Sequence, residues 1–340
     1  MKRKTDLNPN QTHTNTSKRP KQQLKTLNDM SAMMDTDEKQ AEEMDIQNPL
    51  VYVKHLTFNY FEKKVLYDIN LKVMPGQRCL VVGANGAGKS TLLRVLAGRH
   101  MPPSSCEFSV LGTRAPQDQI GGLAFLGNNW SRTVAFAASN VAYQCDMPVR
   151  DMMSKLQMDY PERRDMLVKL LGVDLNWRMH QVSDGQRRRV QIMLGLIKPF
   201  RVLLMDEITV DLDLVARQDL LNFLKSECET RGACILYATH IFDGLDDWTT
   251  HVMYLKAGKT YGVRKLSEFD GWSARKNAGE HNPLLRTVEA RMRAERKEEQ
   301  NFEEAEMLVH EKAHKAMGPQ GGFASGRASM FAAGRMDAYR

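Results

Sequence analysis

The sequence Gly83-Ala84-Asn85-Gly86-Ala87-Gly88-Lys89-Ser90-Thr91 follows the short apolar run 79–82 and precedes the apolar segment 92–96. The order indicates a buried strand, a glycine-rich turn and a helix, and the spacing G-x-x-x-x-G-K-S is that of a phosphate-binding loop. Glycines let backbone N–H groups approach phosphate oxygens, and the positive end of the following helix faces the same anion. Lys89 would bridge the β- and γ-phosphates, and Ser90 would bind Mg²⁺. The loop predicts binding of a nucleoside triphosphate.

Length and composition fit one large or two ordinary domains with a buried core, since 42% of the 340 residues are hydrophobic. No apolar run reaches the roughly 20 residues of a membrane span, and the amino terminus lacks the apolar stretch of a secretory signal. Five cysteines without paired spacing indicate a cytoplasmic or nuclear protein. The net charge of +7 is modest and spread along the chain, so direct nucleic-acid binding is not expected.

Composition divides the chain into three parts. Residues 1–48 are polar and lack aromatic side chains, so they are expected to form a disordered tail. Residues 49–270 alternate short apolar runs with helical patterns, which favours an α/β fold with parallel strands buried on both faces. Residues 271–340 are expected to form a charged helix, from about 284 to 315, and a flexible end.

Polar residues follow two further apolar runs. Asp206 and Glu207 come after the run 202–205, and His240 closes the segment that begins with the run 234–238. We expect the strand at 202–205 to lie beside the phosphate-loop strand, so that both present their carboxyl ends to one ligand-binding edge. Asp206 would then hold Mg²⁺ through water, Glu207 would polarise the attacking water, and His240 would reach the γ-phosphate.

Apolar residues recur at helical spacing in the middle of the chain. One such stretch runs from about 149 to 171 and is interrupted at Pro161, and a second follows Ser183 and ends at Pro199. Ser183 is predicted to be the N-cap of the second helix, with Asp184 at its positive end.

In this order the motifs resemble an ATP-binding cassette (ABC) ATPase domain, from about residue 50 to 269. The set comprises the phosphate loop, the signature Val182-Ser183-Asp184-Gly185-Gln186, the Walker B segment 202–207, Asp213 at the end of the D-loop, and His240 as the switch histidine. A phosphate loop alone would admit many NTPase families. The signature shortly before Walker B is the feature that selects this one.

The resemblance implies a RecA-like P-loop NTPase core with a helical subdomain at about 130–198. It also implies that Tyr60 stacks on the adenine ring. Members of the family act as head-to-tail dimers, in which Ser183, Gly185 and Gln186 of one subunit would close over ATP held by the phosphate loop of the other. A chain with one cassette is therefore expected to form a homodimer or to pair with a second cassette protein.

Several positions depart from the family pattern. In the usual signature L-S-G-G-Q, Asp184 replaces the first glycine and Val182 replaces the leucine. Asn128 is the best match to the glutamine that links ATP to transport domains; it is one methylene shorter and is taken as a candidate metal ligand. In the D-loop, Ile208 stands for proline and 210–213 reads V-D-L-D for S-A-L-D. We expect preserved hydrolysis with an altered coupling element.

Two functions stay open. The chain is similar to single-cassette proteins of fungi, plants and protists, whose fungal member associates with the carbon-catabolite-repression–NOT complex of transcription and mRNA decay. The S-D-G-Q-R-R-R signature, the L-G-N-N-W stretch and the charged carboxyl-terminal extension support this similarity, which implies a soluble ATPase that regulates a protein complex. The alternative is the nucleotide-binding subunit of a transporter whose membrane domains lie on another chain. A chromosome-maintenance ATPase is not expected, because the phosphate loop and Walker B are too close in sequence to enclose a coiled coil.

Overall fold

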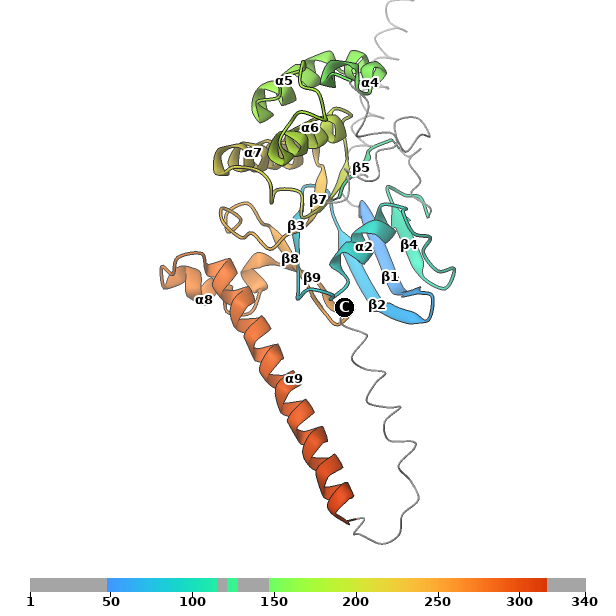
Figure 1. Cartoon of the computed structure of the whole chain (residues 1–340), viewed down its shortest axis with the longest axis vertical. Helices are drawn as coiled ribbons and strands as arrows, with labels where there is room; N and C mark the ends of the chain where they lie inside the picture. The colour runs from blue at the N-terminus through green and yellow to red at the C-terminus, as the bar shows by residue number, and fades with distance from the viewer. Residues whose placement is uncertain (1–47, 115–120, 128–146, 317–340) are drawn as a thin grey trace, which may run out of the picture. The chain divides into compact units, whose positions relative to one another are not determined.

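The computed structural model describes residues 48–114, 121–127 and 147–316 (Figure 1). The chain divides into two compact units, Met1–Phe269 and Asp270–Arg340. The flexible end expected after Gly318 and, except for Asn48, the disordered tail fall outside the described residues.

A six-stranded sheet of strand order β5-β6-β7-β3-β8-β9 carries the phosphate loop. All neighbouring strands are parallel except the antiparallel pair β8 and β9. Every residue of β3, β6 and β7 is buried, which is typical of parallel strands covered on both faces and confirms the α/β class. The strands are β3 (Arg78–Val82), β5 (Leu123–Leu126), β6 (Val202–Asp206), β7 (Cys234–Ala238), β8 (His251–Lys256) and β9 (Lys259–Lys265).

The prediction that the Walker B strand β6 lies beside the phosphate-loop strand β3 is wrong. Strand β7 separates them, and the neighbours of β3 are β7 and β8. Strand order in a parallel sheet depends on where each crossover returns to the sheet, and apolar runs alone do not report this. The three strands are nevertheless parallel, so the residues that follow β3, β6 and β7 still meet at one edge.

An antiparallel sheet of three strands, in the order β2-β1-β4, packs with helix α2 (Lys89–Leu96) against the larger sheet. One apolar core contains buried residues of all three parts, among them Leu56, Leu66, Val81, Leu92, Leu96 and Leu204. The strands are β1 (Val51–Tyr60), β2 (Lys63–Val73) and β4 (Glu107–Val110).

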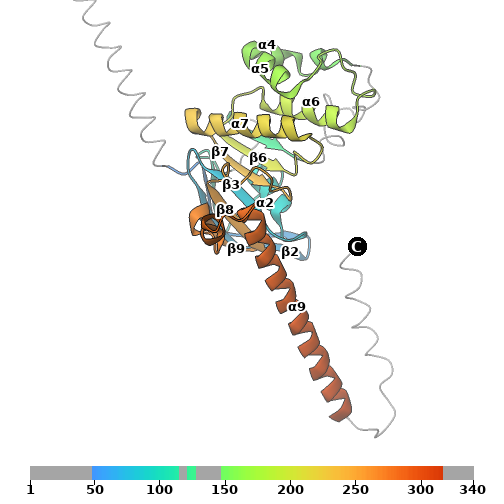
Figure 2. The ribbon, with the colours of Figure 1, turned by 90° about the vertical axis from the view of Figure 1, so that its left-hand side faces the viewer.

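Between β5 and β7, the residues that the structure describes form mainly helices on either side of β6 in the sequence. The helical stretch at about 149–171 is interrupted at Pro161 as predicted: α4 ends at Asp159 and α5 begins at Pro161, since the first helical position needs no backbone N–H donor. The helix after Ser183 begins as predicted, with Ser183 as its N-cap. Figure 2 shows α7 above β6 and β7, with α4 and α5 further from the sheet. The elements are the 3₁₀ helix η1 (Val149–Asp151), α4 (Ser154–Asp159), α5 (Pro161–Leu171), α6 (Asp184–Leu196) and α7 (Leu214–Arg231).

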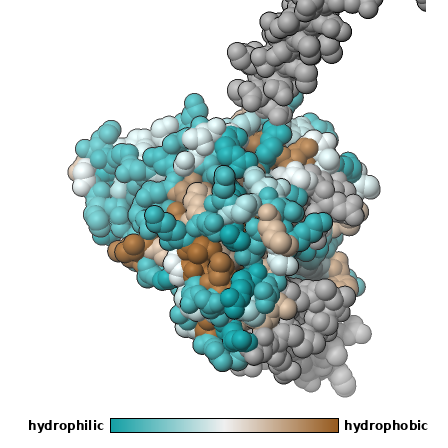
Figure 3. All heavy atoms as spheres, turned by 90° about the horizontal axis from the view of Figure 1, so that it is seen from above, coloured by the Kyte–Doolittle hydropathy of each residue, from teal (hydrophilic) through white to brown (hydrophobic). Residues whose placement is uncertain are grey.

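Seen from above, the surface is largely hydrophilic with separate apolar patches (Figure 3). The exposed apolar side chains of α4, α5 and the residue before α4 are Met158, Met166 and Met153. In the part of the chain that the structure describes, no helix is both long and apolar enough to span a bilayer.

The second unit contains α8 (Trp272–Asn277) and α9 (Pro283–Ala316). Helix α9 covers the charged helix predicted at about 284–315. Charged side chains are paired along its surface, as between Arg293 and Glu289 at 2.7 Å, one turn apart. The 3₁₀ helix η2 (Leu266–Glu268) ends shortly before this unit begins.

A two-residue turn between β8 and β9 links the two sheets and the phosphate loop. Its second residue, Gly258, has φ of 76°, and its carbonyl accepts a hydrogen bond of 2.8 Å from the N–H of Tyr67 in β2. The N–H of Gly258 donates to the carbonyl of Ala87 at 3.0 Å. A Cβ atom at Gly258 would lie 2.1 Å from the carbonyl oxygen of Val65, so only glycine fits.

We predict that Gly258→Ala lowers the free energy of unfolding by about 3 kcal/mol, because the new methyl group meets a backbone atom that cannot easily move. Denaturant unfolding measures this loss. Gly112→Ala is the matched control, since Gly112 has φ of 78° but nothing within 4 Å of the built Cβ. The control should lose only about 1 kcal/mol, and equal losses for the two variants would contradict the assigned contact.

Candidate functional site

The phosphate loop joins β3 to α2 and depends on glycine at several positions. Gly83, Gly86 and Gly88 have φ of 154°, 81° and 104°. A Cβ at Gly83 would lie 2.2 Å from the carbonyl oxygen of Leu255 in β8, and a Cβ at Gly88 would lie 2.8 Å from Leu66. The loop thus passes so close to β8 and to Leu66 that a side chain at either position does not fit, and backbone N–H groups at the start of α2 can face an anion.

Lys89 is the first residue of α2 and is buried. Its ammonium donates hydrogen bonds to the carbonyls of Gly83 at 2.8 Å and Ala84 at 3.1 Å. Burial lowers the pKa of Lys89, and the carboxylates of Glu207 and Asp206 oppose this effect. The Lys89 ammonium is therefore held by carbonyls at the start of the phosphate loop. The remaining predicted loop residues include the exposed Asn85 and the buried Ala87 and Thr91.

Ser90 and Asp206 meet although they come from different elements. The Ser90 hydroxyl donates a hydrogen bond of 2.9 Å to Oδ1 of Asp206, which ends β6. A hydroxyl and a carboxylate oxygen are ligands that Mg²⁺ prefers, and this metal usually completes its coordination with phosphate and water oxygens. Among the described residues no group of three or more His, Cys, Asp and Glu side chains could hold a metal alone. The pair fits a metal that is bound together with a phosphate.

Glu207 lies directly after β6 with φ of 52°, and its N–H donates to the carbonyl of Ala238 in β7 at 2.9 Å. Its Oε2 accepts a hydrogen bond of 3.4 Å from the backbone N–H of His240. Its Oε1 lies 3.2 Å from Nε2 of His240 but is buried without a hydrogen bond. Burial raises the pKa of Glu207, while the neighbouring His240 and Lys89 oppose this effect.

Tyr60, the predicted adenine-stacking residue, ends β1 and contacts His100. The Tyr60 hydroxyl and Nε2 of His100 are 2.8 Å apart, and the rings meet edge to face at 5.2 Å between centroids. Phe58 contacts both rings. Burial and the nearby Arg94 lower the pKa of His100, which favours a neutral imidazole. His100 was not among the predicted site residues, since no motif marks it.

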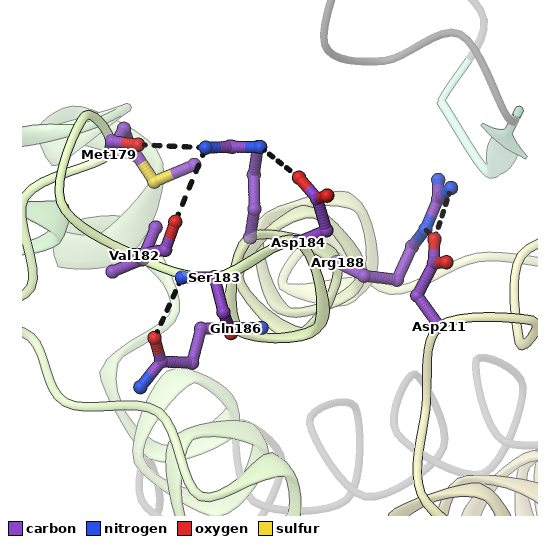
Figure 4. Close-up of polar contacts among 8 residues, drawn as sticks. Met179, Val182, Ser183, Asp184, Gln186, Arg188 and Asp211 are labelled. Atoms are coloured by element: carbon purple, nitrogen blue, oxygen red, sulfur yellow. Dashed lines mark hydrogen bonds and ion pairs between the residues drawn. The ribbon is translucent and has the colours of Figure 1, made fainter.

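The signature residues begin α6 in a capping box. The N–H of Gln186 donates to the Ser183 hydroxyl at 3.3 Å, and the N–H of Ser183 donates to Oε1 of Gln186 at 2.9 Å (Figure 4). Arg187 forms an ion pair with Asp184 and donates to the carbonyls of Met179 and Val182. The exposed carboxylate of Asp184, which stands where the usual signature has glycine, thus has a cationic partner on its own helix.

The structure therefore brings together the phosphate loop, Asp206, Glu207 and His240 at the carboxyl edge of the sheet. Ser183 and Gln186 form the capping box with each other, at the start of α6. Asn128 lies outside the described residues. Arg188 and Gln191 of α6 were not among the predicted site residues. Asp211, which departs from the D-loop pattern S-A-L-D, was an available signal, because its carboxylate pairs with Arg188.

Comparison with known proteins gives consistent matches. Residues 66–210 match the family model described as ABC transporter. The chain is 45% identical to ABC transporter I family member 20 of Arabidopsis thaliana, over 76% of this chain and 80% of that protein. It is 41% identical to CCR4-associated factor 16 of Saccharomyces cerevisiae, over 62% of this chain and 76% of that protein.

The fold resembles a dimeric ATP-binding cassette solved in a post-hydrolysis state with ADP and Pi. The TM-score is 0.50 at 22% identity, over 64% of this chain and 98% of that one. At this identity the match shows likeness of fold.

We predict that His100→Ala weakens ATP binding about fivefold, because the Tyr60 hydroxyl loses a hydrogen-bond partner and its ring is less well held. Titration with ATP and with inorganic tripolyphosphate measures the effect. Binding of tripolyphosphate, which has no base, should stay unchanged. Equal losses for both ligands would show that His100 acts on the phosphate loop instead.

Proposed function

Because the chain belongs to the ATP-binding cassette (ABC) family, we propose that it binds ATP and hydrolyses it to ADP and phosphate as a head-to-tail dimer. The hydrogen bond between Ser90 and Asp206 is the observation that carries this proposal. It joins the phosphate loop to the end of β6, where Glu207 follows, and so supports a site built for a metal-bound triphosphate.

The loop would bind the triphosphate through backbone N–H groups and Lys89. A bound phosphate accepts hydrogen bonds from the Lys89 ammonium, which now donates to Gly83 and Ala84. Ser90 and Asp206 would hold Mg²⁺, which supplies positive charge to the phosphate oxygens. The anion and the metal compensate each other's charge, as in other phosphate-loop proteins.

Glu207 would orient and deprotonate the attacking water. Its buried Oε1 lies 3.2 Å from Nε2 of His240 but makes no hydrogen bond, so it can accept one from a water molecule. His240, which supplies a backbone N–H to Oε2, holds the carboxylate in place, and its half-exposed ring would contact the γ-phosphate. Burial raises the proton affinity of Glu207, which favours its role as a base.

Ser183, Gly185 and Gln186 would complete the site of a second subunit. The capping box orders the first turn of α6, whose positive helix end favours an anion. Asp184 would oppose an approaching phosphate, and its ion pair with Arg187 reduces this repulsion. The dimeric cassette of similar fold supports the expectation of a second cassette as partner.

We predict that Glu207→Gln traps an ATP-bound dimer, because the subunits can close while the water is not activated. Size-exclusion chromatography with and without ATP should show a doubled mass only with ATP. The control is Lys89→Ala in the same background, which should bind no ATP and stay monomeric. A Glu207→Gln protein that remains monomeric with saturating ATP would rule out the dimer.

The biological role that we propose is regulation of a protein complex such as CCR4–NOT, the complex of transcription and mRNA decay. The similarity to the yeast protein called CCR4-associated factor 16 supports it. The alternative role, a nucleotide-binding subunit of a transporter, is supported by the family description and by the name of the Arabidopsis relative.

Co-purification discriminates the two roles. We predict that tagged Glu207→Gln protein, isolated with ATP from its own cells, co-purifies with CCR4–NOT subunits identified by mass spectrometry. Lys89→Ala protein should lose them, since the trapped dimer would be the binding form. Stable recovery of a multi-spanning membrane protein instead would favour the transporter role.

A further inference from the structure

A chain of polar contacts connects α6 to the D-loop 208–213, which follows Glu207. Nε and Nη2 of Arg188 lie 3.0 Å and 2.8 Å from Oδ2 of Asp211 (Figure 4). Asp211 departs from the D-loop pattern S-A-L-D, and the structure pairs its carboxylate with Arg188. The D-loop is also attached to β7, since the Thr209 and Tyr237 hydroxyls are 2.6 Å apart.

The same arginine continues the chain toward β5. Nη1 of Arg188 donates to Oε1 of Gln191 at 2.7 Å, and Nε2 of Gln191 donates to the carbonyl of Gly127 at 2.8 Å. Gly127 follows β5 directly. Four residues from three separate segments therefore form one connected series.

Close packing accompanies these hydrogen bonds at both ends. A Cβ at Gly185 in the signature would lie 3.0 Å from the carbonyl oxygen of Asp211, so the first turn of α6 touches the D-loop. A Cβ at Gly195 would lie 2.4 Å from Leu126 at the end of β5. Helix α6 is thus in direct contact with both segments that its polar side chains bind.

The side chains of this series are buried, so few other residues can replace them. Arg188 is 9% exposed and Gln191 is 3% exposed. A buried guanidinium or amide without partners is costly, so each contact depends on the next. Lysine would keep the charge of Arg188 but could not serve Asp211 and Gln191 through one planar group.

We propose that Arg188 and Gln191 are positioning residues that fix the signature turn of α6 against the D-loop and the end of β5. The inference rests on the proposed function. In the dimer, Glu207 acts on the ATP of its own subunit, whereas Ser183 and Gly185 act on the ATP of the partner. The polar series joins these two half-sites within one chain, so that both surfaces are prearranged for closure.

The test uses the full chain carrying Glu207→Gln and measures the ATP concentration that gives half-maximal dimer. Arg188→Lys and Gln191→Met should each raise this concentration about tenfold. ATP affinity of the dilute monomer should not change, because the phosphate loop makes none of these contacts. Combining Arg188→Lys with Asp211→Asn should add little to Arg188→Lys alone, since both remove one link.

The matched control is Arg163→Lys. Arg163 is also largely buried and bridges two helices, with Nη1 and Nη2 at 3.0 Å and 2.8 Å from Glu227. The Arg163→Lys substitution should lower the melting temperature as Arg188→Lys does, without shifting the ATP concentration that gives half-maximal dimer. An equal shift in the control, no shift with Arg188→Lys and Gln191→Met, or a matching loss of monomer ATP affinity would overturn the inference alone. A Glu207→Gln protein that never dimerises would overturn the proposed function and the inference with it.

Discussion

The hydrogen bond between Ser90 and Asp206 joins two residues 116 positions apart in the chain. It forms only because β3 and β6 run in the same direction and end at the same edge of one sheet, although β7 lies between them. The intervening segment has to leave that edge and return to it. The helices α4, α5 and α6, with the signature at the start of α6, lie within this segment between β3 and β6. The signature therefore lies in the segment that connects Ser90 to Asp206.

Local features of the sequence predicted local structure well. The apolar runs located β3, β6 and β7, and Ser183 was correctly predicted to cap α6, because burial and capping depend on neighbouring residues. The interruption at Pro161 was also predicted correctly, because a proline between two helical stretches is a local signal. The order of β3, β6 and β7 was not predicted correctly, because it is decided by the packing of the crossovers between them.

The candidate site shows the same division. Its motifs identified the phosphate loop, Asp206, Glu207 and His240, and the structure places these residues close together. The sequence could not reveal that Glu207 adopts a positive φ, or that the side chain of His100 contacts Tyr60, which lies 40 residues earlier in the chain. Contacts such as Arg188–Gln191–Gly127 are formed by tertiary packing, so the sequence of α6 does not show which of its polar side chains are buried.

The three arginines that follow the signature have a consequence for the electrostatic potential of the molecule. Read as letters, Arg187-Arg188-Arg189 is a basic cluster of the kind that attracts polyanions. In the fold each has a carboxylate partner: Asp184, Asp211 and Asp213 respectively. Counter-ions are thus supplied by the protein itself, and few would be released on contact with a nucleic acid. The positive charges of the three arginines are therefore compensated by the three carboxylates, and the cluster contributes little positive potential toward solvent.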